Sequence, residues 1–323
     1  MTDESKEGTQ EIRVKSLIAI LFFSILLFAS LARNQFAAIE SALVAEPSLS
    51  STQAETLDGA RRPETLVPKI PAPQLQAEAY LVRIIDSHQI LLEQRASKLL
   101  SPASVTKLMT ALLAVEQLDP DQIITFSRED KGAGEKISDA KEGEQFLRDD
   151  VIRFALINST NDAAYALAEA VGRMHGANTF QDAITIFVGM MNARAGTLGL
   201  TGTFFVNPAG LDAKDHTMSA RDIAILMEYL YNQHQELLGI SRMVFDEVRS
   251  VNGRIHNLSN TNELLKEFPA IVGSKTGLTD QAKGTLAMLY PLVNGKIAVI
   301  ILLGSDDRFE DGRKIIRWLQ EAF

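Results

Sequence analysis

Apolar positions along the chain follow two different spacings, which together predict a mixed fold. Runs typical of strands occur near both ends of the region after residue 75, at residues 79–85, 90–93, 271–276, 286–292 and 297–303. The first two runs are separated by Asp86-Ser87-His88-Gln89, and the last two by Val293-Asn294-Gly295 with its Asn-Gly turn signal. We therefore expect one hairpin at each end of the folded region.

Between the two hairpins, apolar residues recur at helical spacing. The stretch that starts at Ser104, with Pro102 upstream, predicts a buried helix that ends before Pro120. Further helices are predicted at residues 148–158, 161–173, 180–198, 219–233 and 308–322. Distant hairpins with helices between and after them indicate an antiparallel sheet covered by helices, plus a helical insertion. We assign residues 75–323 to one α+β domain.

An uninterrupted apolar run covers residues 16–32. Its length lies between that of a signal-peptide core, about 7–15 residues, and that of a membrane-spanning helix, about 17–25 residues. A cleaved signal peptide and an uncleaved membrane anchor are therefore both open, and we favour the anchor. Three basic residues precede the run and only Arg33 follows it closely, so residues 1–15 are expected in the cytoplasm.

Residues 33–74 are rich in Ala, Ser, Glu and Pro and show neither a strand nor a helix period. Such a composition predicts a flexible tether. We thus expect a single-pass protein of the plasma membrane, with its folded domain on the periplasmic or extracellular side. If the apolar run is cleaved, the protein is secreted instead.

The composition is that of a folded, acidic protein: 46% of residues are hydrophobic, 23% are charged and the formal net charge is −9. No basic run exceeds Arg61-Arg62, so nucleic acid is not expected as a partner. The absence of cysteine excludes disulfides, thiolate metal sites and cysteine nucleophiles. The histidines lack metal-ligand spacing, and we interpret the stretch with Asp212, Asp215 and His216 as a solvated loop. Neither a metal nor an organic cofactor is expected.

The motif Ser104-Val105-Thr106-Lys107 places a hydroxyl and an amine three residues apart on the predicted helix. Residues i and i+3 share a helix face, so the two groups can lie within hydrogen-bond distance. A serine attacks only when a base takes its proton, and a lysine is a base only when it is neutral. Burial or a second cation must therefore lower the lysine pKa from about 10.4.

Two further motifs follow in order: Ser159-Thr160-Asn161 between two predicted helices, and Lys275-Thr276-Gly277 on a predicted strand. Two similar patterns are set aside. Ser138-Asp139-Ala140-Lys141 lies among charges and is interpreted as a surface loop, and Ser250-Val251-Asn252 lies on a polar stretch.

The three motifs together supply the groups that acyl transfer requires. In this interpretation Ser104 is the nucleophile and Lys107 accepts its proton. Ser159 relays that proton to the leaving nitrogen, and Asn161 holds the substrate amide.

The third motif is assigned to substrate binding. Lys275 adds positive charge that keeps Lys107 neutral and attracts a carboxylate, and Thr276 hydrogen-bonds that carboxylate. Gly277 allows a substrate backbone to approach the strand closely. Backbone N–H groups at the helix start and on the strand can form an oxyanion hole.

In this order, the three motifs resemble the signature of the serine penicillin-recognising enzymes. Neighbouring residues narrow the resemblance to the low-molecular-mass penicillin-binding proteins, the D-alanyl-D-alanine carboxypeptidase and endopeptidase family. The matching segments are PASVTKLMT at residues 102–110, NDAA at 161–164, FVNPAGL at 205–211 and SARD at 219–222. The resemblance covers residues 75–323.

The resemblance implies a β-lactamase/D,D-peptidase-like fold, in which an antiparallel sheet flanked by helices lies beside an all-helical subdomain. It implies that peptidoglycan stem peptides are the substrates, and that β-lactams acylate Ser104 as covalent inhibitors. It also implies an oxyanion hole made of the backbone N–H groups of Ser104 and Leu278.

The chain departs from the family pattern at two places. Lys283 stands where the family usually has glycine, within Ala282-Lys283-Gly284-Thr285-Leu286. Asn260-Thr261-Asn262 lacks the arginine that many of the carboxypeptidases carry between two asparagines, which favours the endopeptidase branch. We also expect no C-terminal β-domain after the last helix, with the N-terminal segment as the anchor.

Two other functions stay open. One is a β-lactamase, although Glu228 and Asn232, which imitate a deacylating motif, lie on a predicted helix and are interpreted as helix surface. The other is a β-lactam sensor or wall-binding protein that keeps the pocket and turns nothing over. Carboxypeptidase and endopeptidase activity are not distinguished by the sequence.

Overall fold

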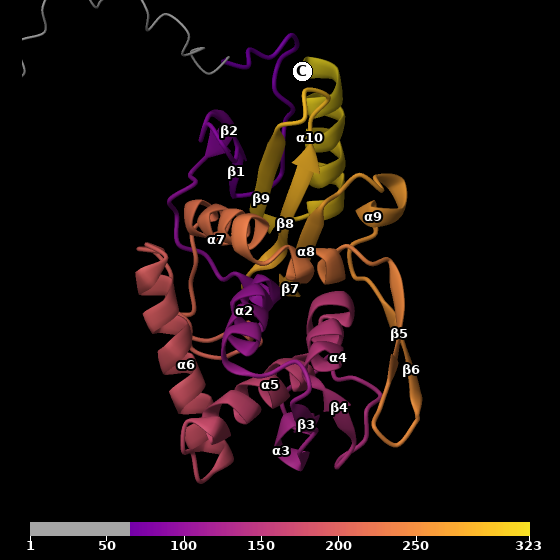
Figure 1. The fold of residues 1–323 in the computed structure, drawn as a ribbon. Coiled ribbons are helices and arrows are strands. Elements are labelled where there is room, and N and C mark those ends of the chain that lie inside the picture. The colour runs from indigo at the N-terminus through magenta and orange to yellow at the C-terminus, as the bar shows by residue number, and fades with distance from the viewer. Residues whose placement is uncertain (1–64) are drawn as a thin grey trace, which may run out of the picture. The chain divides into compact units, whose positions relative to one another are not determined.

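The computed structural model describes residues 65–323, and its centre is a five-stranded antiparallel sheet (Figure 1). The strand order is β2-β1-β9-β8-β7. The strands are β1 (Ala79–Ile84), β2 (Ile90–Gln94), β7 (Gly273–Thr279), β8 (Lys283–Pro291) and β9 (Ile297–Ser305). All five predicted strands are confirmed, with ends shifted by a few residues.

Alternation along the strands gives the sheet two buried faces. In β8, Leu286 and Met288 pack with the helix α10 (Arg308–Ala322), whereas Ala287 and Leu289 belong to the larger core on the opposite face. That face is covered by α7 (Ala220–Gln233) and α8 (Gln235–Ser241), while α10 lies on the other side (Figure 1). The predicted sheet flanked by helices is therefore confirmed.

A mostly helical region completes the larger core. A short 3-10 turn, η1 (Ala103–Thr106), continues directly into α2 (Lys107–Gln117). The other elements are α4 (Arg148–Arg153), the π-helical turn η2 (Phe154–Asn158), α5 (Asn161–Met174) and α6 (Phe180–Thr197). These match the predicted helices closely, but the region also contains a small β-ribbon and is not all-helical.

Several short elements were not predicted. They are β3 (Ile123–Thr125), α3 (Arg128–Lys131), β4 (Gln145–Leu147), α8, β5 (Phe245–Arg249), β6 (Ile255–Ser259) and α9 (Leu264–Glu267). Each is too short to show a period, and the β5–β6 hairpin is mostly polar. Ser250-Val251-Asn252 forms its turn, where the Ser250 hydroxyl donates to Asn252 Oδ1 at 2.6 Å.

Packed structure begins before the predicted domain start at residue 75. The amide of Leu66 donates to the Gln89 side chain at 2.9 Å, and the amide of Lys69 donates to the Ala322 carbonyl at 3.2 Å. The end of the predicted tether therefore lies on the domain. The segments predicted as cytoplasmic (1–15) and membrane-inserted (16–32), and most of the tether, lie outside the described residues. From residue 65 onward, no helix is both long and apolar enough to cross a bilayer.

Candidate active site

Ser104 and Lys107 lie where η1 passes into α2, and their side chains meet. Lys107 Nζ is 2.9 Å from Ser104 Oγ, 2.8 Å from Asn161 Oδ1 and 2.7 Å from the Ala209 carbonyl oxygen. Lys107 is fully buried, whereas Ser104 is half-buried and lines a cleft. The predicted nucleophile–base pair is thus within hydrogen-bond distance.

The partners of Lys107 decide the direction of proton transfer. A neutral amine has two N–H groups and one lone pair. The Ala209 carbonyl and Asn161 Oδ1 can only accept hydrogen bonds, so they take the two N–H groups. The lone pair is then left for the hydroxyl hydrogen of Ser104, which makes neutral Lys107 a base aimed at Ser104.

The surroundings of Lys107 favour this neutral form. Burial lowers its pKa well below the ordinary value of 10.5, and the positive charge of Lys136 lowers it further. The Asp162 carboxylate acts in the opposite direction, but it is already paired with Lys131 at 2.7 Å and accepts the Ser138 hydroxyl at 2.7 Å.

The second motif is held beside this pair by an unusual turn. η2 ends at Ser159, which has a left-handed backbone (φ 62°), and α5 begins at Asn161. The turn points the Ser159 hydroxyl at Lys275, whose Nζ donates to Ser159 Oγ at 2.8 Å and to the Thr276 carbonyl at 2.9 Å. Ser159 and Lys275 are both buried.

Lys275 also sits in a site that disfavours its charge. Burial is the main cause that lowers its pKa well below 10.5. The positive charges of Lys107, Lys136 and Arg308 lower this pKa further. Burial and the charge of Lys136 are what lower the pKa of Lys107, so the expected influence of Lys275 on Lys107 stays a prediction. Lys136 lies on a loop that carries none of the three motifs, so no sequence pattern indicated its role.

The strand β7 brings the third motif against the nucleophile. A Cβ added at Gly277 would lie 2.8 Å from the Ser104 backbone nitrogen and 2.7 Å from the Ala103 Cβ. Gly277 is therefore required by η1 itself, and not only by an approaching substrate as predicted. Leu278 lines the same cleft as Ser104, which is the placement that a shared oxyanion hole needs.

The Thr276 hydroxyl has a hydrogen-bond partner in Thr261, the middle residue of Asn260-Thr261-Asn262, where the sequence departs from the family pattern. Thr276 Oγ1 is 2.6 Å from Thr261 Oγ1, so the Thr261 side chain points at the third motif. The side chains of the two flanking asparagines hold this segment in place. Asn260 donates to the carbonyl of Ser241 at 2.9 Å, and Asn262 donates to Ser274 Oγ at 3.0 Å.

Arg308, the first residue of α10, is a further cation that sequence reasoning missed. Its Nε is buried and has no hydrogen-bond partner among residues 65–323. Its charge lowers the pKa of both Lys275 and Lys136. The residue follows the last strand without a recognisable spacing from any motif, so only the fold places it here.

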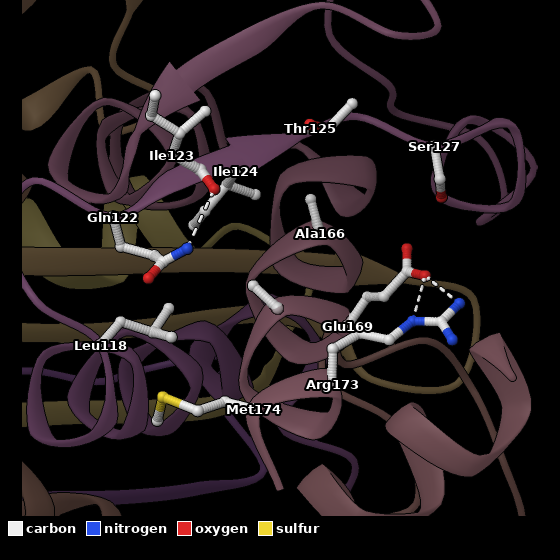
Figure 2. A pocket seen from close by; sticks show the side chains of 11 residues that line it. Leu118, Gln122, Ile123, Ile124, Thr125, Ser127, Ala166, Glu169, Arg173 and Met174 are labelled. Atoms are coloured by element: carbon white, nitrogen blue, oxygen red, sulfur yellow. Dashed lines mark hydrogen bonds and ion pairs between the residues drawn. The ribbon is translucent and has the colours of Figure 1, made fainter. Parts of the chain in front are cut away.

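Ser104, Asn161 and Lys136 line a cleft of about 720 Å³, whereas Lys107, Ser159 and Lys275 are buried behind its surface. Its lining residues come from five separate segments of the chain: Ser104, Gly134, Glu135, Lys136, Asn161, Gly210, Leu211, Asp212, Leu278, Thr279 and Asp280. A separate hollow of about 480 Å³ lies between β3 and α5, where Glu169 and Arg173 form an ion pair (Figure 2). None of the predicted site residues lines that second hollow.

Two expectations for polar residues need correction. His216 is buried and not solvated: its Nε2 is 3.0 Å from Thr106 Oγ1, the Val206 amide donates to its Nδ1 at 3.3 Å, and burial lowers its pKa to about 4. Ser138 is buried too, because its hydroxyl and amide both bind Asp162. Within the described part of the chain, no group of three His, Cys, Asp or Glu residues could hold a metal ion.

Glu228 lies on α7, as predicted, but it is not free helix surface. It forms an ion pair with Arg83 on β1 and lies 3.4 Å from His88 Nδ1. It does not line the cleft with Ser104. Glu228 therefore helps to attach α7 to the sheet and is not placed to act on an acyl-enzyme at Ser104.

Comparisons with known proteins show which family the chain resembles. A family model described as Peptidase S11, D-alanyl-D-alanine carboxypeptidase, matches residues 67–304. The chain is 30% identical over 244 residues to the D-alanyl-D-alanine carboxypeptidase DacF of Bacillus subtilis, which covers 74% of this chain and 60% of that protein. It is 28% identical over 257 residues to a D-alanyl-D-alanine endopeptidase of Pseudomonas aeruginosa, covering 76% and 78%. The chain thus spans only about 60% of the length of carboxypeptidases such as DacF and DacC of Escherichia coli.

Solved structures show the same fold. The DD-transpeptidase of Streptomyces K15 has a TM-score of 0.71 at 23% identity, covering 77% of this chain and 98% of that one. An evolved putative penicillin-binding protein homolog from Mycobacterium tuberculosis has a TM-score of 0.68 at 26% identity, covering 78% and 94%. The expected α+β architecture is therefore confirmed.

Proposed function

The chain belongs to the D-alanyl-D-alanine carboxypeptidase family of peptidases, and on that premise we propose that it is a serine D,D-peptidase acting on peptidoglycan stem peptides. One observation carries the proposal. Two buried lysines in one site each contact a serine hydroxyl, Lys107 with Ser104 at 2.9 Å and Lys275 with Ser159 at 2.8 Å.

Acylation starts from neutral Lys107. Its lone pair takes the hydroxyl proton of Ser104 while Oγ bonds to the carbonyl carbon between the two terminal D-alanines. The backbone N–H groups of Ser104 and Leu278 stabilise the resulting oxyanion. When the C–N bond breaks, Ser159 passes the proton from Lys107 to the leaving nitrogen, and Lys275 orients the Ser159 hydroxyl.

Deacylation reverses the proton path. Water bonds to the ester carbon and gives a proton to Lys107, which has returned to its neutral form. The C–O bond then breaks, and Ser104 Oγ takes this proton back from Lys107, while the second proton of the water is released to solvent as the product acid ionises. The shortened peptide leaves with a new carboxylate, and no net proton remains on the site.

Substrate contacts follow from the free groups of the site. Asn161 uses Oδ1 for Lys107, which leaves its Nδ2 to bind a substrate carbonyl. Lys275 and Thr276 attract and hold the terminal carboxylate. Since a β-lactam presents the same carbonyl and carboxylate, it acylates Ser104 and blocks turnover.

We also propose that the protein is anchored in the plasma membrane by its N-terminal segment. The apolar run at residues 16–32, with more basic residues before it than after it, supports a membrane anchor with residues 1–15 in the cytoplasm. The domain then acts on the outer side of the plasma membrane, where peptidoglycan lies.

The test uses the full chain in detergent with purified muropeptide monomers and dimers and a fluorescent penicillin. We expect Ser104 to be labelled, with release of D-Ala from monomers for a carboxypeptidase or cleavage of dimers for an endopeptidase. Ser104→Ala should abolish labelling and cleavage, because no other hydroxyl among residues 65–323 contacts the Lys107 amine. Ser101→Ala, three residues upstream, serves as the matched control and should retain both.

The other outcomes identify the alternatives. Rapid release of hydrolysed drug would indicate a β-lactamase. Stable labelling without cleavage of either muropeptide would indicate a sensor. Labelling of the Ser104→Ala variant at the wild-type rate would contradict the assigned nucleophile.

A further inference from the structure

Lys136 is a cation without a partner at the mouth of the cleft. It lines the cavity together with Ser104 and Asn161, yet no hydrogen bond or ion pair to its ammonium is found within residues 65–323. The residue as a whole is exposed, but its ammonium is partly desolvated and repelled by Arg308, which lowers its pKa. An ammonium that faces the cleft and has no anion beside it is available to a carboxylate of a bound ligand.

The loop holds Lys136 in position from its backbone. The Lys136 carbonyl accepts the amide of Asn161 at 2.8 Å, and the residue has a positive φ of 30°. Two residues later, the amide and hydroxyl of Ser138 bind the buried Asp162. The lysine is therefore fixed relative to the second motif, whereas its side chain stays free to contact a ligand.

The order of residues along β7 shows which part of a substrate lies near Lys136. Lys275 and Thr276, which hold the terminal carboxylate in the proposed reaction, do not line the open cavity. The cavity lies against Leu278, Thr279 and Asp280, further along the same strand. A peptide bound along β7 with its carbonyl at Ser104 thus places its acyl part, the residues before the scissile bond, in the cavity beside Lys136.

The other charges of the cavity do not neutralise Lys136. The Asp212 carboxylate accepts hydrogen bonds from Thr279 Oγ1 at 2.6 Å and from the Gln281 amide at 3.1 Å. Glu135 and Asp280 are rim residues that form no ion pair with Lys136. Lys136 is the only cation among the lining residues of this described cavity.

From this geometry we propose that Lys136 is a specificity-determining residue that binds a carboxylate on the acyl part of the donor peptide. The inference rests on the proposed function, since it assumes that the peptide lies along β7. Two positions on the acyl part can carry such a carboxylate, and the test distinguishes them: the side chain of the residue before the two D-alanines, and the α-carboxylate of a γ-linked residue before that.

The test measures binding without turnover, using the full chain with Ser104→Ala. Peptides that end in D-Ala-D-Ala are compared with both acyl-side carboxylates free, each one amidated, or both amidated, and the terminal carboxylate stays free in all of them. We expect the fully amidated peptide to bind about tenfold more weakly, the usual effect of losing one charge-assisted hydrogen bond. The two singly amidated peptides identify which carboxylate is bound.

Adding Lys136→Met should remove this preference, so that the free and amidated peptides bind alike. Lys141→Met, which removes an exposed lysine from the same loop outside the cavity, should keep the preference. An unchanged preference in the Lys136→Met variant, or no preference in its parent, overturns the proposal.

Turnover by the wild-type chain separates this inference from the proposed function. If wild-type protein cleaves the peptides but Lys136→Met leaves the preference intact, the peptidase assignment stands and the role of Lys136 is wrong. If the preference depends on Lys136 but no peptide is cleaved, the binding role stands and the peptidase assignment is wrong.

Discussion

At the scale of single residues, Lys283 shows why the family usually has glycine at the start of β8. Its backbone is left-handed (φ 52°), a conformation that is unfavourable for any residue with a Cβ. Its ammonium lies 2.8 Å from Asp306, an exposed ion pair that contributes little. The substitution therefore strains the chain locally without changing the strand pairing, since Lys283 pairs with Thr279.

This strain can be measured by comparing two substitutions that both remove the ion pair. Lys283→Gly relieves the left-handed strain, whereas Lys283→Ala keeps it. We expect the glycine variant to melt about 2–4 °C above the alanine variant, as followed by circular dichroism. Equal melting temperatures would show that the backbone is not strained at this position.

At the scale of elements, the site depends on how closely η1 packs on β7. Gly277 leaves no room for a side chain, because an added Cβ would be 2.3 Å from Thr285 Oγ1 as well as 2.8 Å from the Ser104 nitrogen. Gly277→Ala must push the nucleophile segment away from the strand. We expect penicillin acylation to fall by about 100-fold, since small misplacements of reacting groups have effects of that size.

The control for this change is Gly189→Ala, in the middle of α6. No atom lies within 4 Å of a Cβ added there, and alanine is the better helix former. Its acylation rate, measured with the same fluorescent penicillin, should match that of the wild type. A normal rate in the Gly277→Ala variant would show that η1 and β7 need not be in close contact.

At the scale of the whole molecule, the site exists because helices and sheet together bury two lysines. The folded pKa of each is below the unfolded value, so unfolded chains bind more protons between those two pKa values. Between the folded and the unfolded pKa, the two lysines therefore make the free energy of unfolding rise with pH, up to about pH 10.4. Below the folded pKa both lysines are charged in either state, and there they destabilise the fold most.

The same burial sets the pH dependence of acylation. The rate should fall as pH drops through the lowered pKa of Lys107, because only the neutral amine accepts a proton. Lys136→Met removes a nearby positive charge, raises the pKa of Lys107 and should move this acidic limb to higher pH. The measurement is the rate of penicillin acylation as a function of pH. The control variant Lys141→Met should show the same pH profile as the wild type. An identical profile for Lys136→Met would contradict the electrostatic role of Lys136.

Much of the fold was predictable from local pattern. The apolar periods placed all five strands of the sheet and the long helices, because each of these elements buries a face long enough to show its period. Short elements such as α3 and the β5–β6 hairpin were missed, since they bury few side chains and depend on contacts with other segments.

The sequence by itself determined that the side chains of Ser104 and Lys107 meet, since one helical turn brings them together and no distant partner is needed. The tertiary structure alone decided what surrounds them. Lys136, Arg308 and the Ala209 carbonyl come from separate segments of the chain, and neither spacing nor composition encodes such distances. The protonation state of Lys107 depends on burial and on those long-range charges, so it is a property of the folded chain.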